Sequence, residues 1–242
     1  MIRRFVPLFF LLTATVALAD EAAIRKMVAS KLREGTVESV RKSPVAGLYE
    51  VVVRSADGTQ ILYIDERASV LIAGPMFDAK TDRNLTKERL RELSAIKWAS
   101  LPFEWALTTV RGSGRRKIAI LSDPYCPYCK RFESDLATLD DITVHIFMYP
   151  VIRPESVDLT KSVWCSKDRT KAWNDLMLRG IRPSAAPTCA TPVERIVELG
   201  RRLGVTATPA WFLENGEKYD GAVPLAEVRA LLDAAARRTS AR

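Results

Sequence analysis

Two cysteines separated by two residues are the part of this sequence best suited to chemistry. The motif Cys126–Pro127–Tyr128–Cys129 follows an apolar segment at 117–122 and opens a segment with helical spacing. At a helix N-terminus, unpaired backbone N–H groups and the positive end of the helix dipole favour a thiolate over a thiol. We therefore expect Cys126 to attack a disulfide as a nucleophile and Cys129 to resolve the resulting mixed disulfide.

A pair of cysteines at this spacing is also half of a zinc site, which needs two further ligands. The sequence has one histidine, His145, and no second pair of this kind, because Cys165 and Cys189 lie far apart. The redox interpretation is therefore favoured. We expect no metal and no cofactor, the redox group being a disulfide between Cys126 and Cys129 themselves.

Residues 1–19 are typical of a secretory signal peptide. A basic start at 1–4 precedes an apolar run at 5–16, and Ala17–Leu18–Ala19 matches an A-x-A cleavage pattern. The run is shorter than the ~20 residues that span a bilayer, although a membrane anchor is the alternative. We predict cleavage near Ala19 and export of the mature chain.

Export changes what the two remaining cysteines can do, because disulfides persist outside the cytosol. Cys165 and Cys189 are most simply a structural disulfide that closes an insert of helices. Loop-closure entropy gives such a bond roughly 3 kcal/mol of stabilisation. A second redox pair is the alternative, but neither cysteine lies in a redox motif.

The composition excludes several classes of protein. With 242 residues, 48% hydrophobic and 27% charged, the chain is globular rather than disordered. Its 37 basic and 29 acidic residues give a net charge of +8. The basic residues are interspersed with acidic ones, and short runs at 115–117 and 201–202 are typical of solvated surfaces. We expect no nucleic-acid partner.

The elements that position the cysteines fall into two predicted parts joined by a linker. In residues 20–78, apolar spacing predicts a small α+β domain with an antiparallel sheet; its helix is at 24–32 and its strands are at 36–40, 48–53, 60–64 and 69–73. A core of about 60 residues is marginal alone, which favours pairing with a second copy. Residues 79–112 are predicted to be a linker with a helix at 86–100.

Residues 113–242 alternate between strands and helices in the order typical of thioredoxin. Strands are predicted at 117–122, 143–149, 210–213 and 217–219, and helices at 126–139, 155–168, 170–179, 192–203 and from Pro224. In such a fold a cis-proline loop lies beside the cysteine pair, and here that loop is Thr208–Pro209. We expect Thr208 and Pro209 to bind substrate, together with Pro127 and Tyr128.

Five segments together resemble bacterial periplasmic thiol:disulfide interchange proteins of the DsbC/DsbG family. They are Ser43–Leu48, Gly74–Asp78, Asp123–Cys129, Trp164–Asp168 and Gly204–Pro209. The resemblance covers essentially the whole mature chain. It implies an α+β fold with a small N-terminal dimerisation domain, a helical linker and a C-terminal thioredoxin-like domain with a helical insert.

The same resemblance implies a function and partners. It implies a periplasmic homodimer that isomerises wrongly paired disulfides in misfolded exported proteins, with chaperone activity in some members. It also implies that a membrane thiol reductase of the DsbD type reduces Cys126–Cys129. Disulfide isomerase/reductase is the first hypothesis; the alternatives are a dithiol oxidase, a chaperone without a redox role, and a DsbG-like reductase that protects oxidised single cysteines.

Two departures from relatives bear on these alternatives. Pro127–Tyr128 resembles the DsbG subgroup, whereas the DsbC subgroup usually has Gly–Tyr there, and the pair Cys165/Cys189 resembles DsbC. The buried acid of thioredoxin is replaced here by Ile120. Asp123 is a candidate for capping or proton transfer near the motif, with an ordinary loop acid as the alternative.

Overall fold

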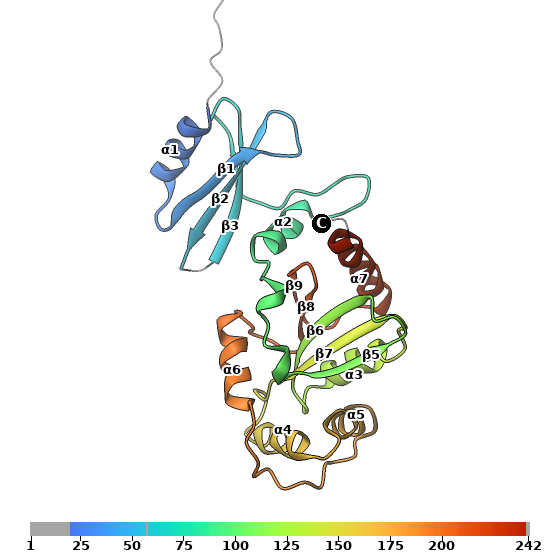
Figure 1. The fold of residues 1–242 in the computed structure, drawn as a ribbon. Helices are drawn as coiled ribbons and strands as arrows, with labels where there is room; N and C mark the ends of the chain where they lie inside the picture. The colour runs from blue at the N-terminus through green and yellow to red at the C-terminus, as the bar shows by residue number, and fades with distance from the viewer. Residues whose placement is uncertain (1–19, 57, 241–242) are drawn as a thin grey trace, which may run out of the picture. The chain divides into compact units, whose positions relative to one another are not determined.

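The computed structural model describes residues 20–56 and 58–240, which form two compact units divided between Leu90 and Arg91 (Figure 1). The signal peptide predicted at 1–19, with its cleavage near Ala19, lies outside the described residues. In the parts of the chain that are described, none of the helices has the length and apolar character needed to cross a membrane.

The first unit is the predicted antiparallel sheet with one helix, so the α+β class is confirmed. Its elements are α1 (Glu21–Lys31), β1 (Thr36–Lys42), β2 (Leu48–Ser55), β3 (Gly58–Asp65) and β4 (Leu71–Ile72), with strand order β1-β2-β3-β4. Ile24 and Val28 of α1 are fully buried against strand residues such as Val51 and Ile64. Because these two residues are four positions apart, they lie on the same face of α1, and that face packs against the sheet.

The edge of this sheet at β4 is apolar and open to solvent. Val70 is 56% exposed, and Leu71 and Ile72 are each more than two-fifths exposed. An apolar edge strand presents unpaired backbone groups that readily pair with another strand.

The helix predicted at 86–100 ends earlier, because a tertiary backbone bond replaces its last turns. The segment folds as α2 (Leu85–Leu93), then the 3₁₀ turns η1 (Trp98–Ser100) and η2 (Phe103–Trp105). Between them the Ile96 N–H donates to the Gly216 carbonyl at 2.9 Å. Gly216 has a φ of 87°, and a Cβ there would collide with the Ile96 carbonyl, so this approach requires glycine.

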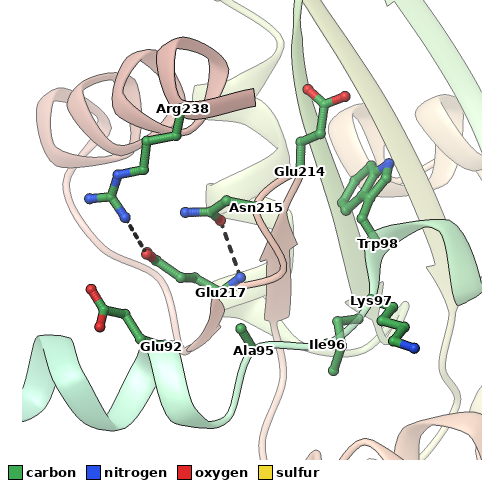
Figure 2. Close-up of a pocket in the computed structure, with 9 residues that line it drawn as sticks. All are labelled: Glu92, Ala95, Ile96, Lys97, Trp98, Glu214, Asn215, Glu217 and Arg238. Atoms are coloured by element: carbon green, nitrogen blue, oxygen red, sulfur yellow. Dashed lines mark hydrogen bonds and ion pairs between the residues drawn. The ribbon is translucent and has the colours of Figure 1, made fainter. Parts of the chain in front are cut away.

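This extended segment borders a pocket of about 650 Å³ beside the turn at 214–217, and Figure 2 shows the residues that line it. The Glu217 carboxylate accepts from Arg238 at 2.8 Å across it. None of the predicted site residues lines this pocket. The segment is thus fixed to the second unit well before the catalytic elements begin.

The second unit has the predicted thioredoxin-like fold, around a sheet of order β5-β7-β6-β8-β9. Its strands are β5 (Leu107–Arg111), β6 (Arg116–Ser122), β7 (Ile142–Met148), β8 (Ala210–Leu213) and β9 (Lys218–Asp220). Its helices are α3 (Pro127–Leu136), α4 (Glu155–Cys165), α5 (Arg169–Arg179), α6 (Val193–Arg202) and α7 (Leu225–Ser240). Strands β6 and β7 are parallel, and the other neighbours are antiparallel.

Hydrophobic clusters cover both faces of this sheet and fix the end of β6. One cluster joins β6 and β7 to α3, α4, α5 and α7, and the other joins them to α6 and to residues near η1 and η2. Ile118, Ala119, Ile120 and Leu121 are fully buried. The chain therefore leaves a rigid central strand at Ser122, four residues before Cys126.

Candidate active site

Cys126 lies at the N-cap of α3, where its sulfur accepts the Cys129 backbone N–H at 3.3 Å. The side chain is 3% exposed, and its thiol donates to the Thr208 carbonyl, also at 3.3 Å. A backbone N–H aimed at the sulfur from a helix N-terminus stabilises negative charge there. This geometry suits a thiolate nucleophile.

The loop before β8 brings Thr208 to this sulfur. Strand β8 pairs antiparallel with β6, and Ala210 lies opposite Leu121, so the residues before Ala210 meet the residues after β6. The Thr208–Pro209 peptide bond is cis, and Pro209 is buried. The structure therefore brings Thr208 and Cys126 together although they are 82 residues apart in the chain.

The other three motif residues differ sharply in exposure. Pro127 occupies the first position of α3 and is exposed, and Tyr128 is 67% exposed. Cys129 is fully buried, and this burial raises the pKa of its thiol above the ordinary value. Both cysteines carry free thiols. Cys126 is thus followed directly by two exposed residues, and Cys129 is sheltered one turn further along.

Asp123 positions the loops around the motif. Its buried carboxylate accepts from the backbone N–H groups of Tyr125 (2.7 Å), Val151 (2.7 Å) and Ile152 (2.9 Å), and from the Ser156 hydroxyl (3.1 Å). These four donors match the capping interpretation made from the sequence. They also hold both carboxylate oxygens in contacts with the loops around the motif.

Sequence reasoning missed a buried acid, Glu133 on α3. The Ser122 hydroxyl donates to its Oε1 at 2.5 Å, and the Trp173 Nε1–H donates to its Oε2 at 2.7 Å. Burial raises the pKa of Glu133 to about 7, against the lowering effect of these two hydrogen bonds. Its position four residues after Cys129 was the available signal, because that spacing places both side chains on one helix face.

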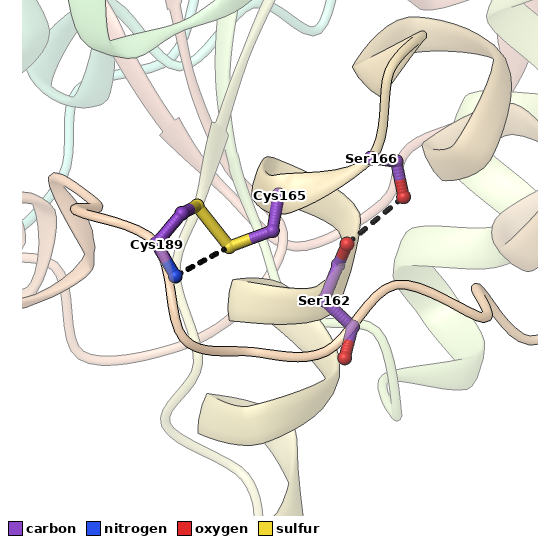
Figure 3. Close-up of a disulfide and its surroundings, with 4 residues drawn as sticks. All are labelled: Ser162, Cys165, Ser166 and Cys189. Carbon is purple, nitrogen blue, oxygen red and sulfur yellow. Dashed lines mark hydrogen bonds between the residues drawn. A yellow bond between two sulfur atoms is a disulfide. The ribbon is translucent and has the colours of Figure 1, made fainter.

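Cys165 and Cys189 form a disulfide that joins the end of α4 to the segment before α6 (Figure 3). The Cys189 N–H donates to the Cys165 sulfur at 3.2 Å, and the Ser166 hydroxyl donates to the Ser162 carbonyl at 2.9 Å. The bond encloses α5 and a segment without regular structure. Over residues 20–56 and 58–240 there is no group of three or more side chains suited to hold a metal ion.

The fold and the cysteine pair together define a thioredoxin-fold thiol–disulfide oxidoreductase. The family model "Thioredoxin-like domain" matches residues 103–236, and "Disulfide bond isomerase protein N-terminal domain" matches residues 15–87. A probable thiol:disulfide interchange protein DsbC from Bordetella parapertussis is 40% identical over 210 residues. The chain belongs to the DsbC family of thiol:disulfide interchange proteins.

The similarity extends along most of the chain. The Bordetella alignment covers 87% of this chain and 73% of that relative. The thiol:disulfide interchange protein DsbC of Salmonella typhimurium is 31% identical, with 99% of each chain covered. A crystal structure of a disulfide interchange protein from Neisseria gonorrhoeae matches 56% of this chain and 99% of its own, with a TM-score of 0.54 and 33% identity.

Proposed function

We propose that this protein is a periplasmic disulfide isomerase and reductase that uses Cys126 as nucleophile and Cys129 as resolving cysteine. The observation that carries the proposal is the sulfur of Cys126 at the N-terminus of α3, one turn before the buried Cys129. Membership of the DsbC family and the signal-like segment at 1–19 support the location.

In the proposed reaction, the Cys126 thiolate attacks one sulfur of a wrongly paired substrate disulfide. A bond forms between Cys126 and that sulfur, and the other substrate sulfur leaves with the electron pair as a thiolate. If this thiolate then attacks a different disulfide of the substrate, the pairing is reshuffled. Once a substrate thiolate attacks the sulfur bonded to Cys126, the enzyme is released unchanged.

Resolution by Cys129 gives reduction instead. Cys129 attacks Cys126, the substrate leaves as a thiolate, and the enzyme holds a Cys126–Cys129 disulfide. Two electrons from an external dithiol must then restore the reduced enzyme. We assign that step to a membrane thiol reductase of the DsbD type, because isomerisation has to start from a reduced Cys126.

Substrate recognition is proposed at the rim of the motif. Exposed Pro127 and Tyr128 flank Cys126 on one side, and the Thr208–Pro209 loop flanks it on the other. Backbone groups of such a loop can pair with an extended substrate strand while the aromatic face of Tyr128 contacts apolar side chains. Misfolded exported proteins present both features.

A homodimer is proposed through the first unit, with residues 20–78 as the dimerisation domain. The apolar edge at Val70, Leu71 and Ile72 supports this, since a second copy of the same edge would cover it symmetrically. Two copies would present two catalytic units to one substrate.

Replacing Cys129 by alanine is expected to accumulate mixed disulfides on Cys126, because the internal attack that resolves them is lost. Non-reducing electrophoresis and mass spectrometry of exported proteins would identify the adducts. The matched control is the same variant with Cys126 also replaced by serine, which should capture nothing. Capture of no substrate by Cys129→Ala would contradict the resolving role. Capture chiefly of proteins with one cysteine would favour the DsbG-like reductase.

The thiol state in cells is expected to be mainly reduced, because only a free Cys126 thiolate can begin isomerisation. Acid quenching, alkylation with a mass-adding reagent and electrophoresis measure it, and a variant with both Cys126 and Cys129 replaced by serine marks the band of a protein without active-site thiols. A mainly oxidised protein would instead indicate a dithiol oxidase.

A further inference from the structure

Glu133 is a buried carboxyl group that the exchange reaction above does not use. It is 8% exposed, although an acid is rarely buried unless its polar atoms are paired. Each of its oxygens accepts one hydrogen bond, from Ser122 and from Trp173. It lies on the buried face of α3, the helix that begins at Cys126.

Ser122 connects this carboxyl group to the resolving cysteine. Its hydroxyl, fully buried at the end of β6, donates to Glu133 Oε1. Cys129 and Glu133 lie four residues apart on the buried face of α3, so this hydroxyl also faces the Cys129 side chain, whose thiol pKa it lowers. A hydroxyl can donate one hydrogen bond while it accepts another. Ser122 is therefore placed to link Cys129 to Glu133.

We propose that Glu133 is a positioning residue for the resolution step, orienting the Ser122 hydroxyl so that it takes the proton of Cys129 and passes its own proton to Glu133. The proposal rests on the roles assigned above to Cys126 and Cys129. It supplies, from α3, an acid that the sequence lacks at Ile120.

The proton and electron balance is complete within the protein and its substrate. Cys129 S–H gives its proton to the Ser122 oxygen, and the Ser122 proton moves to the Glu133 carboxylate. The Cys129 thiolate then bonds to Cys126, and the substrate sulfur leaves with the electron pair of the broken bond. When the Cys126–Cys129 disulfide is later reduced, the same path returns the proton to Cys129.

The surroundings explain why such a path is needed and why Glu133 can serve it. Burial raises the pKa of the Cys129 thiol, so this sulfur loses its proton poorly without a nearby acceptor. The pKa of Glu133 at about 7 lets the carboxyl group change protonation state near neutral pH. Glu133 also lines a cavity of about 70 Å³, which is large enough to hold water.

Neighbouring charged groups are engaged elsewhere. Arg111 of β5 lines the same cavity, but its guanidinium donates to the Leu136 and Leu139 carbonyls. Asp175 of α5 pairs with Lys171 at 2.7 Å. Among the described residues, burial and the bonds from Ser122 and Trp173 are the causes that set the pKa of Glu133.

The test is a two-phase reaction of the reduced full-length protein with dithiobis(nitrobenzoate), an aromatic disulfide whose released thiolate is yellow. Attack by Cys126 releases the first thiolate, and attack by Cys129 on the mixed disulfide releases the second. In the wild type the second rate should rise as pH increases through about 7, because Glu133 must be ionised to accept the proton. Glu133→Gln should slow the second phase at neutral pH by about 100-fold and remove this rise, leaving the first phase unchanged.

Two further variants separate proton transfer from structural support. Ser122→Ala should slow the second phase similarly, and combining it with Glu133→Gln should add little, because both interrupt one path. Trp173→Phe keeps the path but removes a donor to the carboxylate. It should move the inflection of the second phase to higher pH, an effect that a packing role for Glu133 would not produce.

The outcomes are distinguishable. A second phase in Glu133→Gln with the wild-type rate and pH profile would overturn the proposal, as would equal slowing of both phases or an unaffected Ser122→Ala. If Glu133→Gln does not fold, Ser122→Ala and the wild-type pH profile decide. Absence of the first or second release in the wild type would instead overturn the proposed function.

Discussion

Replacing Cys126 by serine is expected to reduce the recovery of scrambled ribonuclease to the uncatalysed background. The serine hydroxyl is a far weaker nucleophile than a thiolate, so no mixed disulfide forms. Serine is also a favourable N-cap residue, so the bond that the Cys126 sulfur accepts from the Cys129 N–H has a replacement. Recovery of ribonuclease activity over time, against a reaction without enzyme, is the measurement.

Comparison with Cys126→Ala separates chemistry from folding. Alanine removes both the nucleophile and the cap, which costs about 1 kcal/mol of helix stability, whereas serine removes the nucleophile alone. Both variants should be inactive, and only the alanine variant should unfold at lower denaturant concentration. Activity retained by Cys126→Ser would exclude Cys126 as the nucleophile and with it the proposed reaction.

Replacing Cys165 and Cys189 together by alanine is expected to lower the free energy of unfolding by roughly 3 kcal/mol. The disulfide closes a loop of 24 residues, including α5 and a stretch after Gly180 that has neither helix nor strand. Cys189 is exposed and Cys165 half-buried, so alanine leaves little cavity and the loss reports loop closure. Urea unfolding followed by circular dichroism measures it.

The matched control uses a protein in which Cys126 and Cys129 are both serine. In that protein a reductant can act on Cys165–Cys189 alone, so reduction should reproduce the loss of stability seen with the alanine pair. An unchanged denaturation midpoint after either treatment would show that the bond contributes no stability. The alternative that this is a second redox pair predicts ready reduction by a cellular dithiol at concentrations that leave the native fold intact.

The sequence was sufficient to predict the part of the site whose residues lie close together in the chain. Cys126 and Cys129 lie at a strand-to-helix junction that hydrophobic patterning already predicts. The contact of Cys126 with Thr208 depended on recognising the thioredoxin order, because 82 residues separate them. Glu133 was missed because a glutamate on a helix is usually solvated, and only the packing of α5 and β6 against α3 buries it.

The fold was predicted well except where tertiary contacts outweigh local preference. The helix expected at 86–100 ends at Leu93, because the Ile96 N–H bonds to the Gly216 carbonyl instead of continuing the helix. Strand β5 was not predicted, because it has only five residues, its sequence does not alternate between apolar and polar, and its Val110 is 59% exposed. Its identity as a strand comes from its register with β7, which sequence alone does not contain.

The four hydrogen bonds accepted by Asp123 have a consequence for how such proteins can be recombined. They tie the turn before Cys126 to the backbone at Val151 and Ile152, so the two segments form one hydrogen-bonded structural unit. Exchanging the dipeptide Pro127–Tyr128 for that of another oxidoreductase leaves this unit whole, so the exchange is a clean probe of the dipeptide. Transplanting a longer active-site loop that includes Asp123 requires the segment at 151–152 as well. Without that segment the Asp123 carboxylate would be buried in the recipient protein without its hydrogen-bond donors.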